Sequence, residues 1–125
     1  MNVVDSSGWL EYLTDAANAD FFALPISDEE NLVTPTICLY EVFKRVLMDF
    51  GEERALEAVG SMEMGKIVDL NRQIAIDAAL LSADMKLAMP DSIILATARA
   101  YSATLWTQDA HFKNFEGVRY IEKKD

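Results

Sequence analysis

Basic residues are scarce in this sequence. Its 125 residues include 11 Lys and Arg against 21 Asp and Glu, which gives a formal net charge of −10. This balance argues against capture of nucleic acid by a broad basic surface. It leaves two classes open. A nucleic-acid enzyme remains possible because a bound metal ion reverses the local charge of a carboxylate site, and an acidic surface attracts a basic protein partner.

Cysteine and long apolar runs are also nearly absent. The one cysteine, Cys38, excludes an intrachain disulfide and fits a reducing compartment. Its apolar neighbours Ile37 and Leu39 favour a buried structural thiol over a nucleophile. No apolar stretch approaches the ~20 residues that span a bilayer, and the first residues do not resemble a signal peptide. We therefore expect a soluble cytoplasmic protein with no membrane partner.

Two motifs of common α/β proteins are missing. No Gly-x-Gly-x-x-Gly occurs, which argues against a dinucleotide-binding domain. A phospho-accepting receiver domain needs a lysine at the end of a late strand, and no predicted strand ends in lysine.

Short apolar runs alternate with helical patterns along the chain. The predicted strands cover 2–4, 31–33, 66–70, 104–107 and 118–121. The predicted helices cover 9–13, 19–24, 35–50, 52–59, 71–85, 89–101 and 110–114. This alternation predicts one α/β domain over residues 1–125, with a mostly parallel sheet between helical layers as an α/β/α sandwich.

Local signals set the ends of these helices. Thr34 and Pro35 predict a helix start, with threonine as the N-cap and proline at the first helical position. Gly51 predicts the end of that helix. Pro25 predicts the end of the helix that begins at Ala19.

Four acidic residues stand in apolar surroundings: Asp5, Glu41, Asp91 and Asp109. An ionised carboxylate beside buried surface costs several kcal/mol unless a cation meets it. Two of the four follow predicted strands and one lies in the first turn of a helix, so we expect them near the carboxyl edge of the sheet. Oxygen ligands of this kind favour a hard divalent metal such as Mg²⁺ or Mn²⁺.

Each acid also has a simpler interpretation. The three aspartates stand where helices begin, so each can serve as a helix cap or complement the helix dipole. Glu41 has no such position, and its alternative is an ion pair with Lys44 or Arg45. Four separate explanations are then needed, whereas a shared metal site needs one.

The segments around these acids form an ordered set of four motifs. They are Val3-Val4-Asp5-Ser6-Ser7, Thr34-Pro35-Thr36 followed by Glu41, the nonapeptide 90–98 that begins Pro-Asp-Ser, and the hexapeptide 107–112 that begins Thr-Gln-Asp. In order and spacing the set resembles the PIN-domain ribonucleases over essentially the whole chain. Within that family, the sequence is most similar to the toxin of VapBC toxin–antitoxin pairs.

The resemblance implies a fold, an activity and partners. The fold is a PIN-like three-layer α/β/α sandwich. The four acids are implied to bind one or two Mg²⁺ or Mn²⁺ ions and to catalyse RNA hydrolysis by metal-activated water, with Ser6 or Thr107 as a supporting hydroxyl. The implied partners are an RNA substrate, an antitoxin protein and a second copy of the chain.

Two positions near the fourth acid qualify this resemblance. Many family members carry a further acid where this chain has His111, which affects the number of metals held. We interpret His111 as a surface residue, because Mg²⁺ prefers oxygen ligands. Gln108 directly precedes the fourth acid, a position that bears on substrate contact.

Other residues have two interpretations each. The residues Lys44, Arg45, Arg72 and Arg99 are either RNA-backbone contacts or solvated charges. The aromatics Trp9, Tyr12, Phe21 and Phe22 either pack in the core or line a groove for an antitoxin helix. The run 95–101 serves either the core or a homodimer face. The alternative function is a catalytically silent PIN-like module that binds protein or RNA without cutting.

Overall fold

The structure, a computed structural model, describes residues 1–124 and contains one parallel sheet. Its five strands are β1 (Asn2–Val4), β2 (Leu32–Pro35), β3 (Lys66–Val68), β4 (Thr104–Thr107) and β5 (Val118–Tyr120). Their order across the sheet is β3-β2-β1-β4-β5, and every pairing is parallel. In the central register, Val3 stands between Val33 and Leu105. The inner strands are buried, which explains why they read as apolar runs without alternation.

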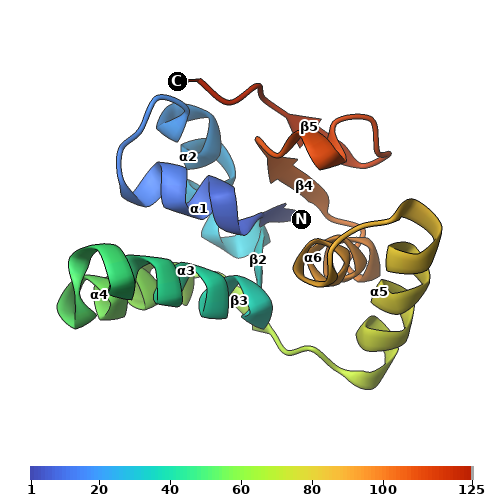
Figure 1. Cartoon of the computed structure of the whole chain (residues 1–125). Helices are drawn as coiled ribbons and strands as arrows, with labels where there is room; N and C mark the ends of the chain where they lie inside the picture. The colour runs from blue at the N-terminus through green and yellow to red at the C-terminus, as the bar shows by residue number, and fades with distance from the viewer. Residues whose placement is uncertain (125) are drawn as a thin grey trace.

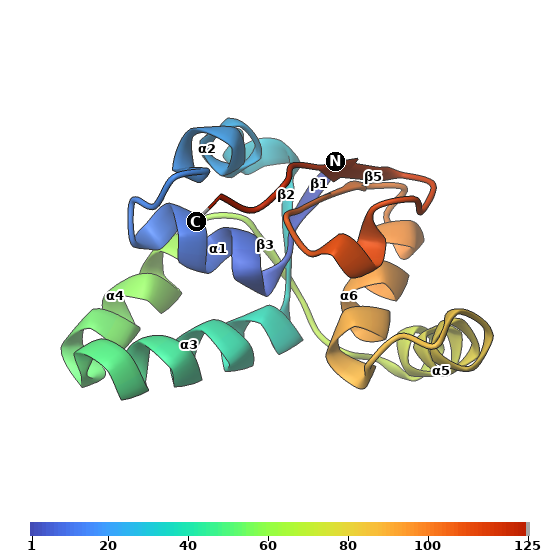
Figure 2. The ribbon, with the colours of Figure 1, turned by 45° about the horizontal axis from the view of Figure 1, so that its top comes forward.

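The helices lie in two layers (Figure 1). The α-helices are α1 (Ser6–Leu13), α2 (Ala19–Ser27), α3 (Thr36–Phe50), α4 (Glu52–Met62), α5 (Arg72–Met85) and α6 (Met89–Ala100), and the 3₁₀ turns are η1 (Glu29–Asn31) and η2 (Ala110–Phe112). Figures 1 and 2 show α1–α4 on one side of the sheet and α5–α6 on the other. The expected α/β/α sandwich is therefore confirmed. None of these helices has the length and apolar character that a bilayer crossing requires.

The chain reverses its direction across the sheet beside β1. From β1 it proceeds to β2 and β3, and α5 and α6 then carry it back to β4 on the other side of β1. The carboxyl ends of β1 and β4 therefore flank the point where the strand order reverses. Parallel α/β sheets form their sites at such points, because loops leave in opposite directions and open a crevice.

Two helix ends differ from the sequence-based prediction. Thr34 and Pro35 remain in β2, paired with Ile67 and Val68, and α3 begins one residue later with Pro35 as its uncapped N-cap residue. The Thr34 hydroxyl donates to the Met62 carbonyl instead of capping the helix. Sheet pairing thus overrides the local start signal.

The predicted stop at Pro25 is also wrong, because α2 continues to Ser27. Pro25 and Ile26 are both buried, so packing against the core stabilises the last turn despite the missing N–H. The remaining strand and helix ends agree with the prediction or differ from it by at most three residues, which is close to the usual scatter of element boundaries.

The core takes most of the residues with a double interpretation. Trp9 and Phe22 are fully buried between α1, α2 and the sheet, so they do not line an exposed groove. Leu95, Ala96 and Ala98 of α6 are likewise buried within the chain. These residues of α6 therefore belong to the core. A homodimer face on this side of the sheet would have to use the end of α6 and helix α5.

Gly8 allows the closest approach in this core. A Cβ at Gly8 would stand 2.6 Å from Phe22 Cε1 and 2.8 Å from Val4 Cγ1. Because both neighbours are buried and belong to different elements, neither has room to yield. Glycine at this position therefore lets α1 sit directly on α2 and β1.

We expect Gly8→Ala to destabilise the protein by about 2 kcal/mol, the usual size of an overpacking penalty. Gly60→Ala is the matched control, since nothing lies within 4 Å of a Cβ there. At this exposed position of α4, Gly60→Ala should raise the free energy of unfolding by about 0.5–1 kcal/mol. Urea unfolding followed by tryptophan fluorescence measures both. A Gly8→Ala protein as stable as the wild type would contradict this packing.

Candidate metal centre

Asp5 lies directly after β1 and is held by hydrogen bonds on both carboxylate oxygens. Its Oδ1 accepts from the Gly8 N–H at 2.8 Å, so the capping interpretation holds for this oxygen. The Ser7 hydroxyl lies 3.0 Å from Oδ1, and the Thr107 hydroxyl donates to Oδ2 at 2.5 Å. Asp5 is only 4% exposed. All of its donors are neutral, so its charge has no cationic partner among residues 1–124.

Thr107 joins Asp5 to Asp109. While its hydroxyl donates to Asp5, the same oxygen accepts from the Asp109 N–H at 2.9 Å. Asp109 caps η2, because its Oδ1 accepts from the His111 N–H at 2.9 Å. Its carboxylate remains partly exposed at the mouth of the site. The adjacency of β1 and β4 in the sheet thus places two predicted site residues around one hydroxyl.

Glu41 lies in the second turn of α3 and faces α1. The Ser6 hydroxyl donates to its Oε1 at 2.7 Å. The alternative ion pair does not form in the described chain, since Arg45 pairs with Asp49 and Lys44 stands over the Tyr40 ring. Glu41 is half-buried at a rim that also carries an exposed tyrosine, so it has more access to solvent than the sequence pattern indicated.

Asp91 and His111 complete the cluster. Ligand atoms of Asp91, Asp109 and His111 all lie within 4.8 Å of one another. The His111 Nδ1 lies 3.3 Å from the Asp109 Oδ1. No donor contacts the Asp91 carboxylate within residues 1–124, so it is available to a ligand. The prediction of His111 as a surface residue is confirmed, and its ring also lies close to Asp91 and Asp109.

Burial and neighbouring charges raise the pKa of two of the four acids, Asp5 and Asp91. Burial is the main cause that raises the pKa of Asp5 to about 6; the hydrogen bonds from Thr107, Gly8 and Ser7 oppose it, and the charge of Asp109 adds to it.

The pKa of Asp91 also rises to about 6. Burial is again the largest cause, the charges of Asp109 and Glu41 add to it, and His111 opposes it. The charge of Asp109 acts on both Asp5 and Asp91, and that of Glu41 acts on Asp91, so the four acids lie near one another. Oxygen donors that repel one another and lack a lysine or arginine fit a divalent cation.

Cys38 lies beneath this region as a buried thiol. Its Sγ contacts the Val4 carbonyl at 3.8 Å. Burial raises the pKa of the thiol well above its usual range, and the nearby charges of Asp5, Glu41 and Asp91 add to the effect. The prediction of a structural thiol is confirmed, because a thiolate is disfavoured here.

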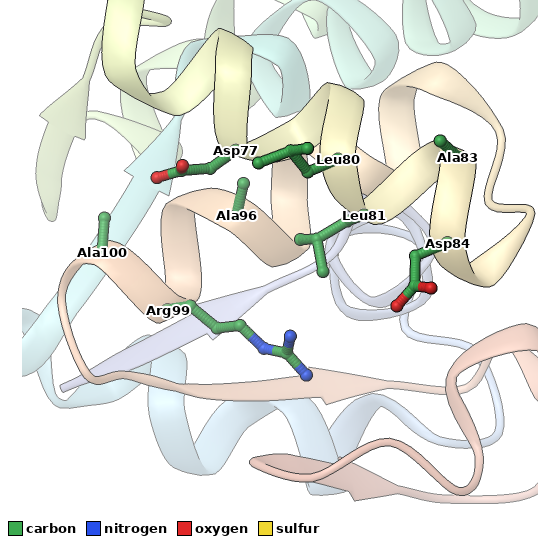
Figure 3. A pocket seen from close by; sticks show the side chains of 8 residues that line it. All are labelled: Asp77, Leu80, Leu81, Ala83, Asp84, Ala96, Arg99 and Ala100. Atoms are coloured by element: carbon green, nitrogen blue, oxygen red, sulfur yellow. The ribbon is translucent and has the colours of Figure 1, made fainter.

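Two hollows on the surface differ in their relation to the acids. The one beside them, of about 370 Å³, is lined by Ser6, Ser7, Leu10, Tyr40, Glu41, Lys44, Arg45 and Met48. The larger one, of about 760 Å³, lies between α5 and α6 and contains none of the four acids. In Figure 3, Leu80 and Leu81 stand between Asp77 and Asp84, with Arg99 extending from α6. The larger hollow is therefore not the one next to the candidate metal site.

Gln108 is not placed to contact substrate, contrary to the prediction. It is 5% exposed, and its amide bonds Glu11 and Asn18. No local pattern indicated this buried polar group or the Ser7 contact with Asp5, whereas the place of Asp5 before a helix did predict its cap.

Comparison with known families gives one match. The sequence model of the PIN domain family matches residues 3–118. No curated protein sequence matches the chain.

Comparison with solved structures gives 29 chains of similar fold. A toxin–antitoxin complex from Klebsiella pneumoniae is 22% identical with a TM-score of 0.80, over 95% of this chain and 96% of that chain. DNA-bound VapBC from Salmonella typhimurium is 19% identical with a TM-score of 0.75, over 98% of both chains. Mycobacterium tuberculosis VapC20, described as a sarcin-ricin loop cleaving toxin, is 13% identical with a TM-score of 0.75, over 90% of this chain and 93% of that chain.

We expect the metal-free protein to lose stability as the pH rises from 4.5 to 7. A carboxyl whose folded pKa is raised stabilises the fold fully below its unfolded pKa of 3.8, and this contribution disappears as the pH rises through about 6. For buried Asp5 the upper bound is about 3 kcal/mol. Thermal unfolding in a chelator measures the loss. Asp91→Asn should flatten the pH dependence, and an unchanged profile would exclude Asp91 as a contributor.

Proposed function

We propose a function for this chain on the premise that it belongs to the PIN domain family: it is a cytoplasmic, metal-dependent endoribonuclease, the toxin of a type II toxin–antitoxin pair. The observation that carries the proposal is the carboxylate cluster at the ends of β1 and β4. Asp91 and Asp109 offer ligand atoms within 4.8 Å of one another and of His111. Within residues 1–124 no lysine or arginine pairs with these acids, and burial raises the pKa of Asp5 and of Asp91 to about 6, which supports a site for a cation.

The chain's own residues have distinct parts in this proposal. Asp91 and Asp109 bind Mg²⁺ or Mn²⁺ directly, since both are open to a ligand. Thr107 holds Asp5 in one orientation, and Asp5 adds negative charge beside the metal ligands. Ser6 orients Glu41 toward the cluster. A bound Mg²⁺ or Mn²⁺ would supply a water of lowered pKa as the nucleophile and would offset the negative charge on the phosphate oxygens. No side chain then has to act as the nucleophile, which suits a chain whose cysteine is buried.

The hollow beside the acids supports RNA as the substrate. Tyr40 is 61% exposed next to Glu41 and offers a face on which a base stacks. Lys44 and Arg45 line the same hollow and are placed to meet phosphates. Arg99 lies instead in the hollow between α5 and α6, so we leave it out of the substrate contacts.

We propose that the antitoxin covers α3 and α4. Exposed apolar side chains on these helices are Tyr40, Leu47, Met48, Phe50 and Leu56. Tyr40 and Met48 line the hollow that also contains Glu41, so a helix laid on them would also restrict access to the acids. The net charge of −10 favours a basic partner.

We propose that a second copy of the chain covers α5 and α6. Leu80 and Met89 are 65% and 66% exposed there. The hollow between these helices carries acids at Asp77 and Asp84 together with the basic Arg99. A surface with both charges is self-complementary about a two-fold axis, because an acid of one copy can meet the arginine of the other.

We expect purified protein to cleave RNA with Mg²⁺ or Mn²⁺. Glu41→Gln should lower the cleavage rate at least about 100-fold, because loss of a residue that only supports a metal ligand already costs about 10–100-fold. The amide keeps an acceptor for Ser6, so folding should be unaffected. Glu53→Gln is the control: it changes the net charge equally on an exposed turn of α4. Initial rates on a fluorescent RNA give the comparison.

The same measurements separate the nuclease from the silent module. Calorimetric titration with Mn²⁺ should show binding that Asp91→Asn removes. Absence of both cleavage and Mn²⁺ binding up to millimolar concentration would favour the silent module. Metal-dependent cleavage that survives both Glu41→Gln and Asp91→Asn would disprove the proposed site.

Substitutions of two exposed leucines, Leu80 on α5 and Leu56 on α4, test the dimer surface and the antitoxin surface. Each substitution is the control for the other. Light scattering of the free protein should give about twice 14.0 kDa, and Leu80→Glu should give a monomer. Leu56→Glu should leave the dimer intact and weaken inhibition by the protein encoded beside this gene. A monomeric wild type would refute self-association, and full inhibition of Leu56→Glu would place the antitoxin elsewhere.

A further inference from the structure

Three buried polar residues form a hydrogen-bonded group just beyond the end of β4. They are Glu11 near the end of α1, Asn18 in the turn before α2, and Gln108 just after β4. Their exposed fractions are 8%, 2% and 5%. Within residues 1–124 no basic side chain pairs with Glu11, which is unusual for a buried acid.

Hydrogen bonds close these residues into a ring. Glu11 Oε2 accepts from the Asn18 backbone N–H at 2.8 Å, and Glu11 Oε1 accepts from Gln108 Nε2 at 3.1 Å. Gln108 Oε1 accepts from Asn18 Nδ2 at 3.0 Å. The Asn18 amide also donates to the Glu122 carbonyl at 3.1 Å, which ties the last described segment to the ring.

The direction of every bond follows from the carboxylate. Glu11 can only accept, so Gln108 must turn its NH₂ group toward it and its carbonyl toward Asn18. Asn18 must then present its own NH₂, which leaves its Oδ1 buried and without a partner. An orphan acceptor costs about 1–3 kcal/mol. Because the carboxylate fixes which way both amides turn, the ring has one arrangement of its donors and acceptors, despite the cost of this unpaired oxygen.

The ring is anchored next to the acids through Gln108. Gln108 stands between Thr107, whose hydroxyl holds Asp5, and Asp109, whose N–H donates to that hydroxyl. Neighbouring side chains leave an extended backbone on opposite sides. The Gln108 amide is therefore fastened on one side while Thr107 and Asp109 are presented on the other. Within residues 1–124, the Asp109 carboxylate is held only by the exposed His111.

Helix α1 gives the ring a second connection to the site. Asp5 caps the beginning of α1, and Glu11 projects from its later turns. The peptide after β4 is thereby clamped to α1 at two places, by Thr107 to Asp5 and by Gln108 to Glu11. Two bonds on opposite sides restrict rotation of this peptide, and with it the direction of Asp109.

We propose that Glu11, Asn18 and Gln108 are positioning residues that fix Asp109 relative to Asp91 and so determine the affinity of the acidic cluster for a divalent cation. The part that concerns metal rests on the proposed function. The part that concerns the place of Asp109 does not, because it holds in the metal-free protein.

The first test is Gln108→Leu, which keeps the volume and removes both amide bonds. The Kd for Mn²⁺, measured by calorimetry far below the unfolding temperature, should rise about tenfold. The chain has one histidine, so the ring-proton NMR signal of His111 is unambiguous and reports the place of Asp109 without metal. That signal should shift in Gln108→Leu.

The second test exchanges the two partners. Gln108→Glu alone sets two carboxylates against each other and should weaken Mn²⁺ binding or prevent folding. Glu11→Gln restores a donor opposite the new carboxylate, so the double variant E11Q/Q108E can remake all three bonds of the ring with the polarity of one reversed. Its His111 signal and Mn²⁺ affinity should return to within about threefold of wild type, at unchanged net charge.

Gln73→Glu is the matched control. The Gln73 amide also donates to a carboxylate, that of Asp77 at 3.0 Å, but on the exposed face of α5. The variant should leave the His111 signal and Mn²⁺ affinity unchanged.

A purely structural role would lower the thermal midpoint of Gln108→Leu with the His111 signal and Mn²⁺ affinity intact, and this result would overturn the proposal. The proposal would also be overturned if E11Q/Q108E folds but its His111 signal does not return to that of the wild type. If Gln108→Leu does not fold, this double variant alone decides whether the proposal holds. A wild type that binds no Mn²⁺ would instead refute the proposed function, and the metal-free NMR comparison would still decide the positioning role.

Discussion

The arrangement of the site depends on one hydroxyl at the end of β4. Thr107 donates to Asp5 and accepts from the Asp109 N–H, so it joins the ends of the two central strands. The bond is possible only because β1 and β4 are neighbours in parallel register, with Val4 opposite Trp106. Everything that brings those strands together therefore contributes to the site: the two helical layers, the crossover through α5 and α6, and the close packing at Gly8.

The chain treats the buried carboxylate of Glu11 and the half-buried one of Asp91 in two opposite ways. Glu11 is matched to amide donors and lies in a closed ring, so its charge is satisfied by the fold alone. Asp91 has no donor among the described residues, and its neighbours Asp109 and Glu41 raise its pKa further. The first arrangement stabilises a structure, whereas the second stores unfavourable electrostatic energy that a cation would relieve. Gln108 of the first arrangement and Asp109 of the second are consecutive residues just after β4.

Much of the fold was predictable because its signals are local. The strands Asn2–Val4 and Thr104–Thr107 have the predicted bounds, since buried parallel strands read as short apolar runs. Gly51 ends α3 with a φ of +93°, a conformation that glycine adopts readily. Local signals failed at Thr34, Pro35 and Pro25, where pairing with β3 or burial in the core prevailed.

By itself, the sequence determined the order of strands and helices and the placing of acids after β1 and β4 and at the start of α6. Those features depend on residue type and spacing alone. Only the tertiary structure decided which groups meet: Ser6 with Glu41, His111 with Asp91 and Asp109, and Gln108 with Glu11. These contacts join segments of different elements, some about a hundred residues apart. Their geometry is therefore set by side-chain direction and packing, which no local pattern encodes.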